Sequence, residues 1–197
     1  MSSEDLSLVK PAQSRRGKGK SVVFKGSGKP WGRNDITVYV KRQSHYLRRA
    51  AWRLYRLTPM LRCEKRALEA CKVLGVPVPD IVSYKEEGDE VELVLAEIKN
   101  ALSLSDAMNS RGVQREMLIQ NVGRLFAKLH KGQWAHGSLI DEHILVQMSD
   151  YSVHLIDLEK ATFGIVRKKR DLARFFRQAT YLSAVEKQQL LDAYHAL

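Results

Sequence analysis

Cysteine is scarce in this chain of 197 residues, which contains only Cys63 and Cys71. The surrounding pattern places both on one helix, two turns apart. Their Cα atoms are then about 12 Å apart at roughly 1.5 Å of rise per residue. A disulfide needs Cα atoms within roughly 7 Å of each other, and two such cysteines without a second cluster of ligands make a poor zinc site. We therefore expect reduced thiols in the core, and neither a disulfide framework nor structural zinc.

Long apolar runs are also missing. No segment approaches the roughly 20 apolar residues that a transmembrane helix needs. The N-terminal sequence MSSEDLSLVKPAQSRRGKGK lacks the apolar core of a secretion signal. These absences predict a cytoplasmic protein.

Acidic residues are fewer than basic ones. The chain has 33 Lys and Arg against 22 Asp and Glu, which gives a formal net charge of +11 and a pI near 9.7. Such a charge favours a polyanionic partner: nucleic acid, an anionic membrane face or a phosphorylated substrate. Residues 1–20 are polar and basic and predict a disordered tail. This tail is either simply solvated or an electrostatic tether to anionic lipid head groups.

Short strands and one helix are expected in the first half of the chain. The segment ITVYVKRQ alternates apolar and polar residues, as a half-buried strand does. The expected elements are a β-rich run at residues 21–24, a strand at 36–43, a helix at 59–74 and a β-hairpin at 76–98 with its turn near Gly88.

The second half is mainly helical in pattern. An apolar stripe predicts helix across residues 103–132, and the segments RDLARFFRQ and SAVEKQQLLDAYHAL predict two closing helices. The elements are segregated rather than alternating as βαβ units, so the fold class is α+β. We expect a sheet with one helix in residues 21–98. A mostly helical part should follow in residues 99–197, with a hairpin segment at 136–161.

One charged residue interrupts the apolar face of the helix at 59–74. The core-facing positions at 3.6 residues per turn are Leu61, Leu68, Cys71 and Leu74. Glu64 falls within this stripe, where a carboxylate is costly unless a cation meets it. Lys41, at the end of the preceding apolar strand, is the natural partner. The alternatives are that Glu64 reaches solvent or pairs with one of the nearby arginines.

Polar residues flank two short apolar strands, Ile144–Val146 and Val153–Ile156, which are joined by a turn-like MSDY segment. In an antiparallel hairpin the start of the first strand lies beside the end of the second, so His143 and Asp157 meet at one end. The loop 136–142 adjoins them. An imidazole and a carboxylate suit a divalent cation whose shell is completed by phosphate oxygens. The alternative is that Asp157 simply caps a turn.

A lysine held by a helix glutamate, together with an aspartate beside a loop histidine, is the arrangement that binds nucleotide phosphates and magnesium in kinases. On these residues and the motifs around them the sequence resembles the lipopolysaccharide core kinase family (Kdo and heptose kinases, with an InaA-like branch) from about Val22 to its end. The motifs are VYVK, RCEKRAL, LGVPVP, LAEI, FAKLHKGQWAHGSLIDEHILV, LIDLEKA and RKKRDLARF. The resemblance implies a protein-kinase-like bilobal fold. Its N-lobe would be a small antiparallel sheet with one key helix, and its C-lobe short and mostly helical.

The resemblance also implies ATP and Mg²⁺ as cofactors. Lys41 would bind phosphate, with Glu64 as its ion-pair partner. The backbone groups of Glu97 and Ile98, in the LAEI segment, would meet the adenine. The glycines at 26, 28 and 32 do not have the GxGxxG spacing, so the phosphate-covering loop is not evident from the sequence.

The metal and catalytic-loop residues follow in the same way. Asp157 would be a metal ligand, and His143 stands where most kinases have a metal-binding asparagine, as in the lipopolysaccharide branch. His136 would support the catalytic loop through hydrogen bonds, and Asp171 would brace that loop.

The usual catalytic aspartate is absent, because Ser138 occupies its place two residues after His136. A serine cannot accept a proton near neutral pH as a carboxylate can. Asp141 or Glu142 could substitute by turning into the same space. Alternatively, phosphoryl transfer proceeds slowly without a base, or the protein binds nucleotide without transferring phosphate.

Three functions follow from these observations. The first is an ATP-dependent kinase that phosphorylates a sugar hydroxyl of the lipopolysaccharide inner core, Kdo or heptose, while associated peripherally with the anionic inner-membrane face. The second is a pseudokinase that binds nucleotide or a partner. The third is a basic RNA-associated protein, with Trp52 and Tyr55 among interleaved arginines.

Overall fold

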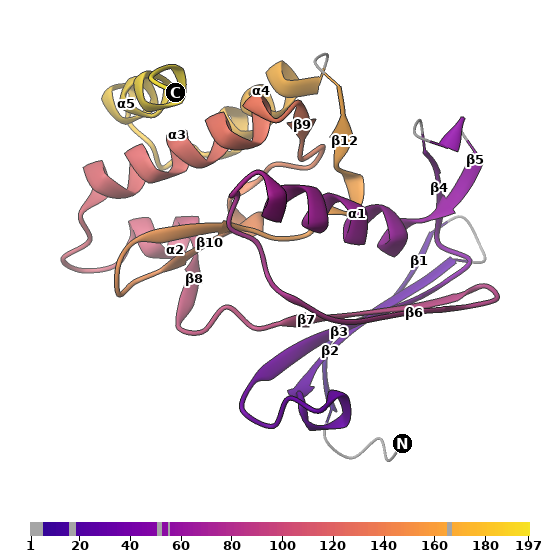
Figure 1. Cartoon of the computed structure of the whole chain (residues 1–197). Coiled ribbons are helices and arrows are strands. Elements are labelled where there is room, and N and C mark those ends of the chain that lie inside the picture. The colour runs from indigo at the N-terminus through magenta and orange to yellow at the C-terminus, as the bar shows by residue number, and fades with distance from the viewer. Residues whose placement is uncertain (1–5, 16–18, 51–52, 55, 165–166) are drawn as a thin grey trace. The chain divides into compact units, whose positions relative to one another are not determined.

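The chain falls into two compact units, each described by itself below (Figure 1). The computed structural model describes residues 6–15, 19–50, 53–54, 56–164 and 167–197. The first unit comprises Met1–Arg66 and Pro79–Glu97, and the second comprises Ala67–Val78 and Ile98–Leu197.

An antiparallel sheet of five strands forms the first unit. Its strands are β1 (Leu6–Arg15), β2 (Gly19–Ser27), β3 (Thr37–Ser44), β6 (Ile81–Glu87) and β7 (Glu90–Ala96). Their order across the sheet is β1-β2-β3-β7-β6. Strand β3 is therefore central, between β2 and β7.

The two faces of β3 carry different chemistry. Val40 is opposite Phe24 on β2 and Val94 on β7, and Val38, Val40 and Val94 form a fully buried cluster on this face. Successive side chains of a strand point to opposite faces. Lys41 consequently projects from the other face of the sheet.

A two-stranded hairpin precedes the first long helix. It pairs β4 (Leu47–Ala50) with β5 (Arg56–Pro59) and leads directly into α1 (Met60–Val73), as Figure 1 shows. The left-handed residue Gly75 follows the end of α1. The first part of α1, through Arg66, belongs to the first unit, and its remainder belongs to the second.

Helices dominate the second unit. They are α2 (Leu104–Met108), α3 (Arg115–Lys131), α4 (Lys168–Gln178) and α5 (Ala184–His195). Phe126 of α3 and Phe175 of α4 meet edge to face, with ring centroids 5.1 Å apart. Helix α5 packs closely on α3 at Gly123, where an added Cβ would lie 2.5 Å from the carbonyl oxygen of Leu190.

Short strands complete the second unit. They are β8 (Ala101–Ser103), β9 (Trp134–Ala135), β10 (Ile144–Gln147), β11 (Ser152–Leu155) and β12 (Thr162–Phe163). One sheet has the order β11-β10-β8, and β12 pairs with β9. Short 3-10 turns in the described part of the chain lie at Lys29–Trp31, Asp141–His143 and Leu158–Lys160.

Several elements agree with the sequence. The helix expected at 59–74, the hairpin with its turn at Gly88 and the pairing of Ile144 with Leu155 are all present. The closing helix α5 begins with a capping box between Ser183 and Glu186. Both cysteines are buried free thiols.

One expectation is wrong. The disordered tail expected for residues 1–20 includes Leu6–Arg15, which instead forms β1 by pairing its backbone with β2. The polar sequence of β1 gave no strand signal. An edge strand has only one neighbouring strand and buries few side chains, so it needs no apolar pattern. The helical pattern expected across 103–132 is present as two helices, which are separated between Met108 and Arg115. Trp52 and Tyr55 lie outside the described residues.

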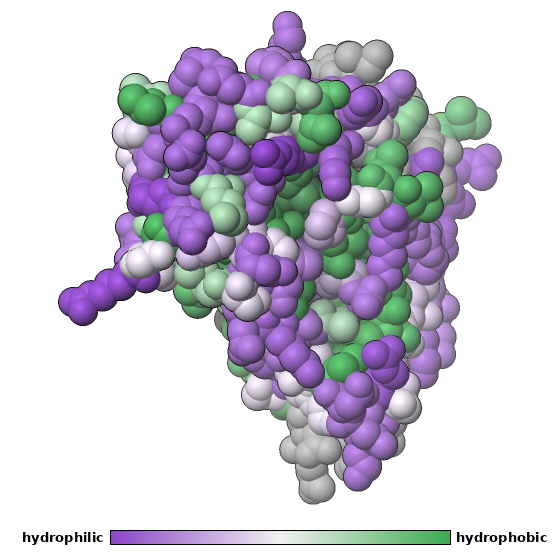
Figure 2. Space-filling model, turned by 60° about the vertical axis from the view of Figure 1, so that its left-hand side comes forward, coloured by the Kyte–Doolittle hydropathy of each residue, from purple (hydrophilic) through white to green (hydrophobic). Residues whose placement is uncertain are grey.

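The face of the molecule drawn in Figure 2 is mostly polar. Hydrophilic residues cover most of the face drawn in Figure 2, with hydrophobic ones scattered among them. None of the helices in the described part of the chain is both long and apolar enough to cross a membrane.

Gly123→Ala tests the close approach of α5 to α3. Alanine is the better helix former by about 1 kcal/mol, but its Cβ would overlap the Leu190 carbonyl. We expect the free energy of unfolding, measured in urea, to fall by about 1–3 kcal/mol. The exposed Lys128→Ala on the same helix should change it by less than about 0.5 kcal/mol. An unchanged or raised value for Gly123→Ala would contradict the packing.

Candidate active site

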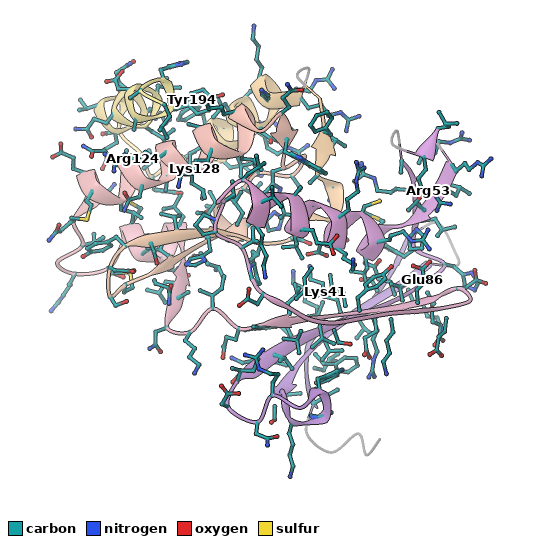
Figure 3. The ribbon with its side chains drawn as sticks, viewed as in Figure 1. Lys41, Arg53, Glu86, Arg124, Lys128 and Tyr194 are labelled. Carbon is teal, nitrogen blue, oxygen red and sulfur yellow. The ribbon has the colours of Figure 1, made fainter. Side chains whose placement is uncertain are left out.

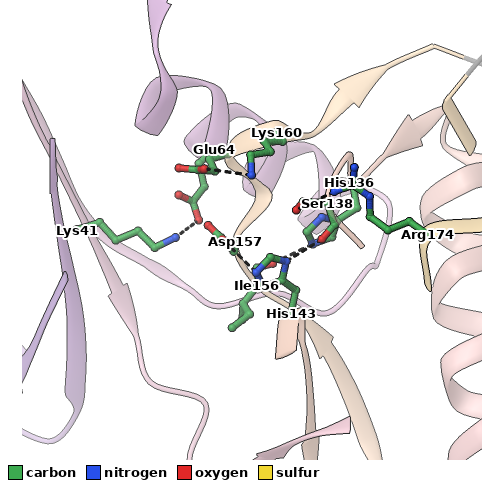
Figure 4. Close-up of polar contacts among 10 residues, drawn as sticks. Lys41, Glu64, His136, Ser138, His143, Ile156, Asp157, Lys160 and Arg174 are labelled. Carbon is green, nitrogen blue, oxygen red and sulfur yellow. Dashed lines mark hydrogen bonds and ion pairs between the residues drawn. The ribbon is translucent and has the colours of Figure 1, made fainter. Parts of the chain in front are cut away.

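A buried ion pair joins the central strand of the first unit to α1. The ammonium of Lys41 donates to Glu64 Oε1 at 2.6 Å. The Glu64 side chain is 0 % exposed and that of Lys41 is 16 % exposed. Breaking such a pair is costly because it leaves a buried charge without compensation. The pairing predicted from the sequence is thus present, and it holds the lysine amine at a fixed position over the sheet (Figure 4).

The connection between β2 and β3 is held by hydrogen bonds within its own backbone. The Gly28 amide donates to the Ile36 carbonyl at 2.9 Å, and the Arg33 amide donates to the Gly28 carbonyl at 3.1 Å. An added Cβ on Gly28 would lie 2.5 Å from the Arg33 oxygen. Glycine at this position therefore serves a tight turn between two strands.

Glu97 is tied to the sheet of its own unit. Its amide donates to the Thr37 carbonyl at 2.9 Å, and its carboxylate accepts from Lys25 at 2.6 Å. The Glu97 amide therefore already has a hydrogen-bond acceptor. Contact of the Glu97 and Ile98 backbone with adenine stays a prediction, with the Glu97 carbonyl as the group to consider.

In the second unit a buried carboxylate holds the loop after β9. Asp171, on α4, accepts hydrogen bonds from the amides of His136 at 2.5 Å and Gly137 at 2.9 Å. The side chain of His130 is 3.5 Å away and also contacts Tyr194. Asp171 is 2 % exposed, so these donors replace the water that its charge has lost. Asp171 therefore braces the loop, and His130 has a structural role.

Gly137 allows the loop to pass close to its neighbour. Its φ is +77°, and an added Cβ would lie 2.3 Å from the Lys160 carbonyl oxygen. Both features exclude a side chain here. The HGS segment is therefore restricted by its backbone at the glycine.

His136 is a fully buried neutral imidazole. Its Nε2 donates to the Ile156 carbonyl at 2.9 Å, because a carbonyl can only accept. Burial and the adjacent His143 lower its pKa to about 4. The two rings are stacked with centroids 5.5 Å apart. His136 thus links the loop to the end of β11, the supporting role expected from the sequence, and its full burial keeps it away from a substrate hydroxyl.

His143 and Asp157 meet at the open end of the β10–β11 hairpin. The Ile156 amide donates to the His143 carbonyl at 3.0 Å, which extends the hairpin pairing by one step. His143 Nδ1 donates to the Ser138 carbonyl at 2.8 Å. Its Nε2 is consequently turned to Asp157, with 3.1 Å between Nε2 and Oδ2 (Figure 4). Asp157 has φ +59°, a conformation that aspartate tolerates better than most residues.

This pair fits a cation. The Nδ1–H group of His143 donates a hydrogen bond to the Ser138 carbonyl. The Nε2 atom then presents a lone pair to the Asp157 carboxylate, unless a second proton or a metal ion lies between the two. Adjacent ligands of an octahedral ion at ~2.1 Å are about 3.0 Å apart, close to the observed separation. The described residues contain no group of three or more His, Cys, Asp and Glu that could hold a metal. Water or phosphate oxygens would have to complete the shell.

Ser138 is buried and its hydroxyl faces a cation. It is 7 % exposed, and Arg174 on α4 donates to its Oγ at 3.5 Å. The sequence did not single out Arg174, although it lies one helical turn after Asp171. That spacing places the two side chains on the same side of α4. The structure thus puts a guanidinium, rather than a base, beside the residue at the catalytic aspartate position.

Asp141 and Glu142 lie on the 3-10 turn that precedes β10. Their negative charges act on Tyr181, whose pKa is raised first by burial and then by Asp141. Asp141 is partly buried and Glu142 exposed. Their charges therefore lie near Tyr181, and their use as a substitute base stays a prediction.

Two further ion pairs were not anticipated. Arg62 on α1 binds Glu86 on β6 through two nitrogens, and Arg115 on α3 binds Glu186 on α5 at 2.6 Å. The latter contact lowers the pKa of Glu186 to about 2. Neither Glu86 nor Glu186 interrupts an apolar stripe as Glu64 does, so the sequence offered no reason to look for a cation beside them.

The Lys41–Glu64 pair predicts strong coupling between its members. Glu64→Gln should lower the free energy of unfolding by about 3 kcal/mol, since it removes a buried partner charge. Lys41→Met should cost less in the Glu64→Gln background than in the wild type. Urea unfolding of the single and double variants measures this difference. Additive costs would contradict a direct pair, and the exposed Glu69→Gln on α1 is the matched control.

Asp171→Asn tests the brace on the catalytic loop. One carboxylate oxygen becomes an amide nitrogen that faces a backbone N–H, so a hydrogen bond is lost and a buried donor is left unsatisfied. We expect a loss of about 2 kcal/mol in unfolding free energy. The exposed Asp192→Asn on α5 should have little effect. Equal losses for the two variants would exclude a special role for Asp171.

Comparisons with known proteins identify the fold and the family. The crystal structure of an aminoglycoside-3'-phosphotransferase of type VIII is similar, with a TM-score of 0.66 and 15 % identity, over 98 % of this chain and 86 % of that chain. This likeness shows a protein-kinase-like fold, with an antiparallel-sheet part and a helical part as expected from the sequence. No curated protein matches the chain. The model of the lipopolysaccharide kinase (Kdo/WaaP) family matches residues 3–194, so the chain belongs to that family.

Proposed function

We propose that this chain is an ATP-dependent kinase that phosphorylates a sugar hydroxyl, Kdo or heptose, of the lipopolysaccharide inner core. Family and fold support a kinase, and the family implies ATP and usually Mg²⁺. The acceptor is a glycolipid at an anionic membrane face, which suits a chain with a formal net charge of +11.

The observation that carries the proposal is the 3.1 Å separation of His143 Nε2 and Asp157 Oδ2. These two residues would hold the divalent ion, which neutralises charge on the transferring phosphate when it is bound. Imidazole nitrogen is a softer donor than the oxygen that Mg²⁺ prefers. Mn²⁺ should therefore support nucleotide binding at least as well as Mg²⁺.

Lys41 would bind nucleotide phosphate oxygens. Its amine is held by Glu64, so the positive charge is placed before the ligand arrives and less entropy is lost on binding. The carboxylate of Glu64 also keeps the lysine charged, as a phosphate contact requires.

Transfer would proceed without the usual aspartate. Ser138 cannot act as a base near neutral pH, but its neighbour Arg174 is a hydrogen-bond donor that can stabilise negative charge on a phosphate or on the acceptor oxygen. Catalysis of phosphoryl transfer depends mainly on positioning and charge stabilisation. Asp141 is the candidate for accepting the proton of the sugar hydroxyl.

A second candidate function is nucleotide binding without transfer. The contact between Arg174 and Ser138 favours it, because a guanidinium occupies the side of the loop where a kinase needs a base. Arg174 and Ser138 thus decide between the two candidates.

Asp157→Ala tests nucleotide binding. Wild-type protein with ATP and Mg²⁺ at about 100 times the dissociation constant should melt roughly 5–10 °C higher than without them. Asp157→Ala should abolish this shift, whereas Asp150→Ala, in the turn at the other end of the same hairpin, should keep it. A full shift in Asp157→Ala would refute the metal assignment.

Label transfer from ATP to purified inner-core lipopolysaccharide separates the two candidates. Labelled glycolipid from the wild type, reduced in Asp141→Ala, supports the kinase. No transfer by the wild type, but transfer by Ser138→Asp, supports nucleotide binding alone.

A further inference from the structure

The β4–β5 hairpin, called here the basic hairpin, has an unusual distribution of side chains. Residues 47–59 contain four arginines and no acidic residue. In the pairing, Arg49 is opposite Leu57 and Ala50 is opposite Arg56. Directly opposed residues share a face of a two-stranded sheet, so the chemistry of each face follows from this register.

The face of the basic hairpin that carries Ala50 and Thr58 is buried at these two residues. Ala50 is 2 % exposed and Thr58 is 0 % exposed, whereas Arg56, opposite Ala50, is exposed. Other parts of the chain therefore cover Ala50 and Thr58.

The other face exposes leucines beside arginine. Leu47 is 44 % exposed and Leu57 is 61 % exposed, and Arg49 lies between them on the same face. Leu54, in the connection of the two strands, is 86 % exposed with φ +50°. Folding normally buries such leucines, which are each worth more than tenfold in an equilibrium constant when taken out of water. Their exposure points to an apolar partner.

Arginines of the hairpin and of α1 lie near Cys63. Burial raises the pKa of Cys63, and the charges of Arg48 and Arg53 of the hairpin and of Arg66 and Arg62 of α1 oppose this rise, although Arg62 is itself paired with Glu86. Arg53, labelled in Figure 3, comes from the connection of the hairpin itself. A partner that offers both apolar chains and negative charge would match leucines that lie among arginines.

We propose that the basic hairpin is a membrane-docking element that inserts Leu54 and Leu57 into the interface of an anionic lipid bilayer. Leucine at the level of the head groups would bury apolar surface, and the arginines would contact lipid phosphates. RNA is a poorer match, because it offers stacking bases and phosphates but no aliphatic surface for exposed leucines. This inference does not depend on catalysis: a protein that only binds nucleotide could dock in the same way.

The test is co-sedimentation with vesicles of neutral phosphatidylcholine, or with 30 % phosphatidylglycerol added. The wild type should bind the anionic vesicles. Leu54→Ser with Leu57→Ser should weaken this binding at least tenfold, and Arg49→Gln with Arg56→Gln should weaken it about tenfold or more, since each surface arginine contributes roughly fivefold.

Matched controls exclude a general effect. Val185→Ser removes another exposed apolar residue, on α5, and Arg124→Gln with Lys128→Gln removes the same charge from α3. Figure 3 labels both α3 positions. These controls should bind vesicles within twofold of the wild type. All variants should keep the wild-type melting temperature and ATP-induced shift, which separates a docking defect from misfolding or a lost nucleotide site.

Four results would overturn the proposal. The first is a lack of binding to anionic vesicles, and the second is equal loss in the α3 charge control. The third is full binding by Leu54→Ser with Leu57→Ser. The fourth is that Arg49→Gln with Arg56→Gln keeps vesicle binding but loses RNA binding, which would identify the basic hairpin as a nucleic-acid surface.

Discussion

The buried carboxylate of Asp171 is the constraint on which the second unit's site depends. It accepts the amides of two consecutive loop residues, His136 and Gly137. His136 then donates to the Ile156 carbonyl, and Ile156 pairs with His143. A single charge on α4 thus orients the loop and, through backbone contacts, the strand end that carries Asp157. No step in this series requires an exposed or flexible side chain.

The same helix supplies the residue that most distinguishes this site. Arg174 lies one turn beyond Asp171 and donates to Ser138. A carboxylate at position 138 would be within reach of an ion pair with this arginine. The serine avoids that pair and leaves the guanidinium's remaining donors for other acceptors. Serine at the aspartate position therefore removes the acid and also changes the group to which Arg174 donates.

The positive charge of the chain is not spread evenly over the structure. Inside the units, cations and anions are paired: Lys41 with Glu64, Arg62 with Glu86 and Arg115 with Glu186. The excess of positive charge is conspicuous in the basic hairpin, where arginines alternate with exposed leucines. A chain with a formal net charge of +11 can in this way keep its structural pairs neutral and still present a cationic surface to a partner.

The sequence by itself determined many of the strands and helices, the family resemblance and the two pairs of site residues. Periodicity placed Glu64 in an apolar stripe, and hairpin geometry placed His143 beside Asp157. Both inferences use neighbours along one element or across one turn. Local pattern is sufficient for such contacts, because the element's own period fixes which side chains meet.

Tertiary structure alone decided the rest. The contact of Arg174 with Ser138, the strand β1 within an apparently disordered tail and the outward leucines of the basic hairpin all depend on which segments pack together. Hydrogen bonding also fixed the proton of His143 on Nδ1, since only the fold brings the Ser138 carbonyl to that nitrogen. Unlike Glu64 in its apolar stripe, these features interrupt no local pattern, and so only the folded chain reveals them.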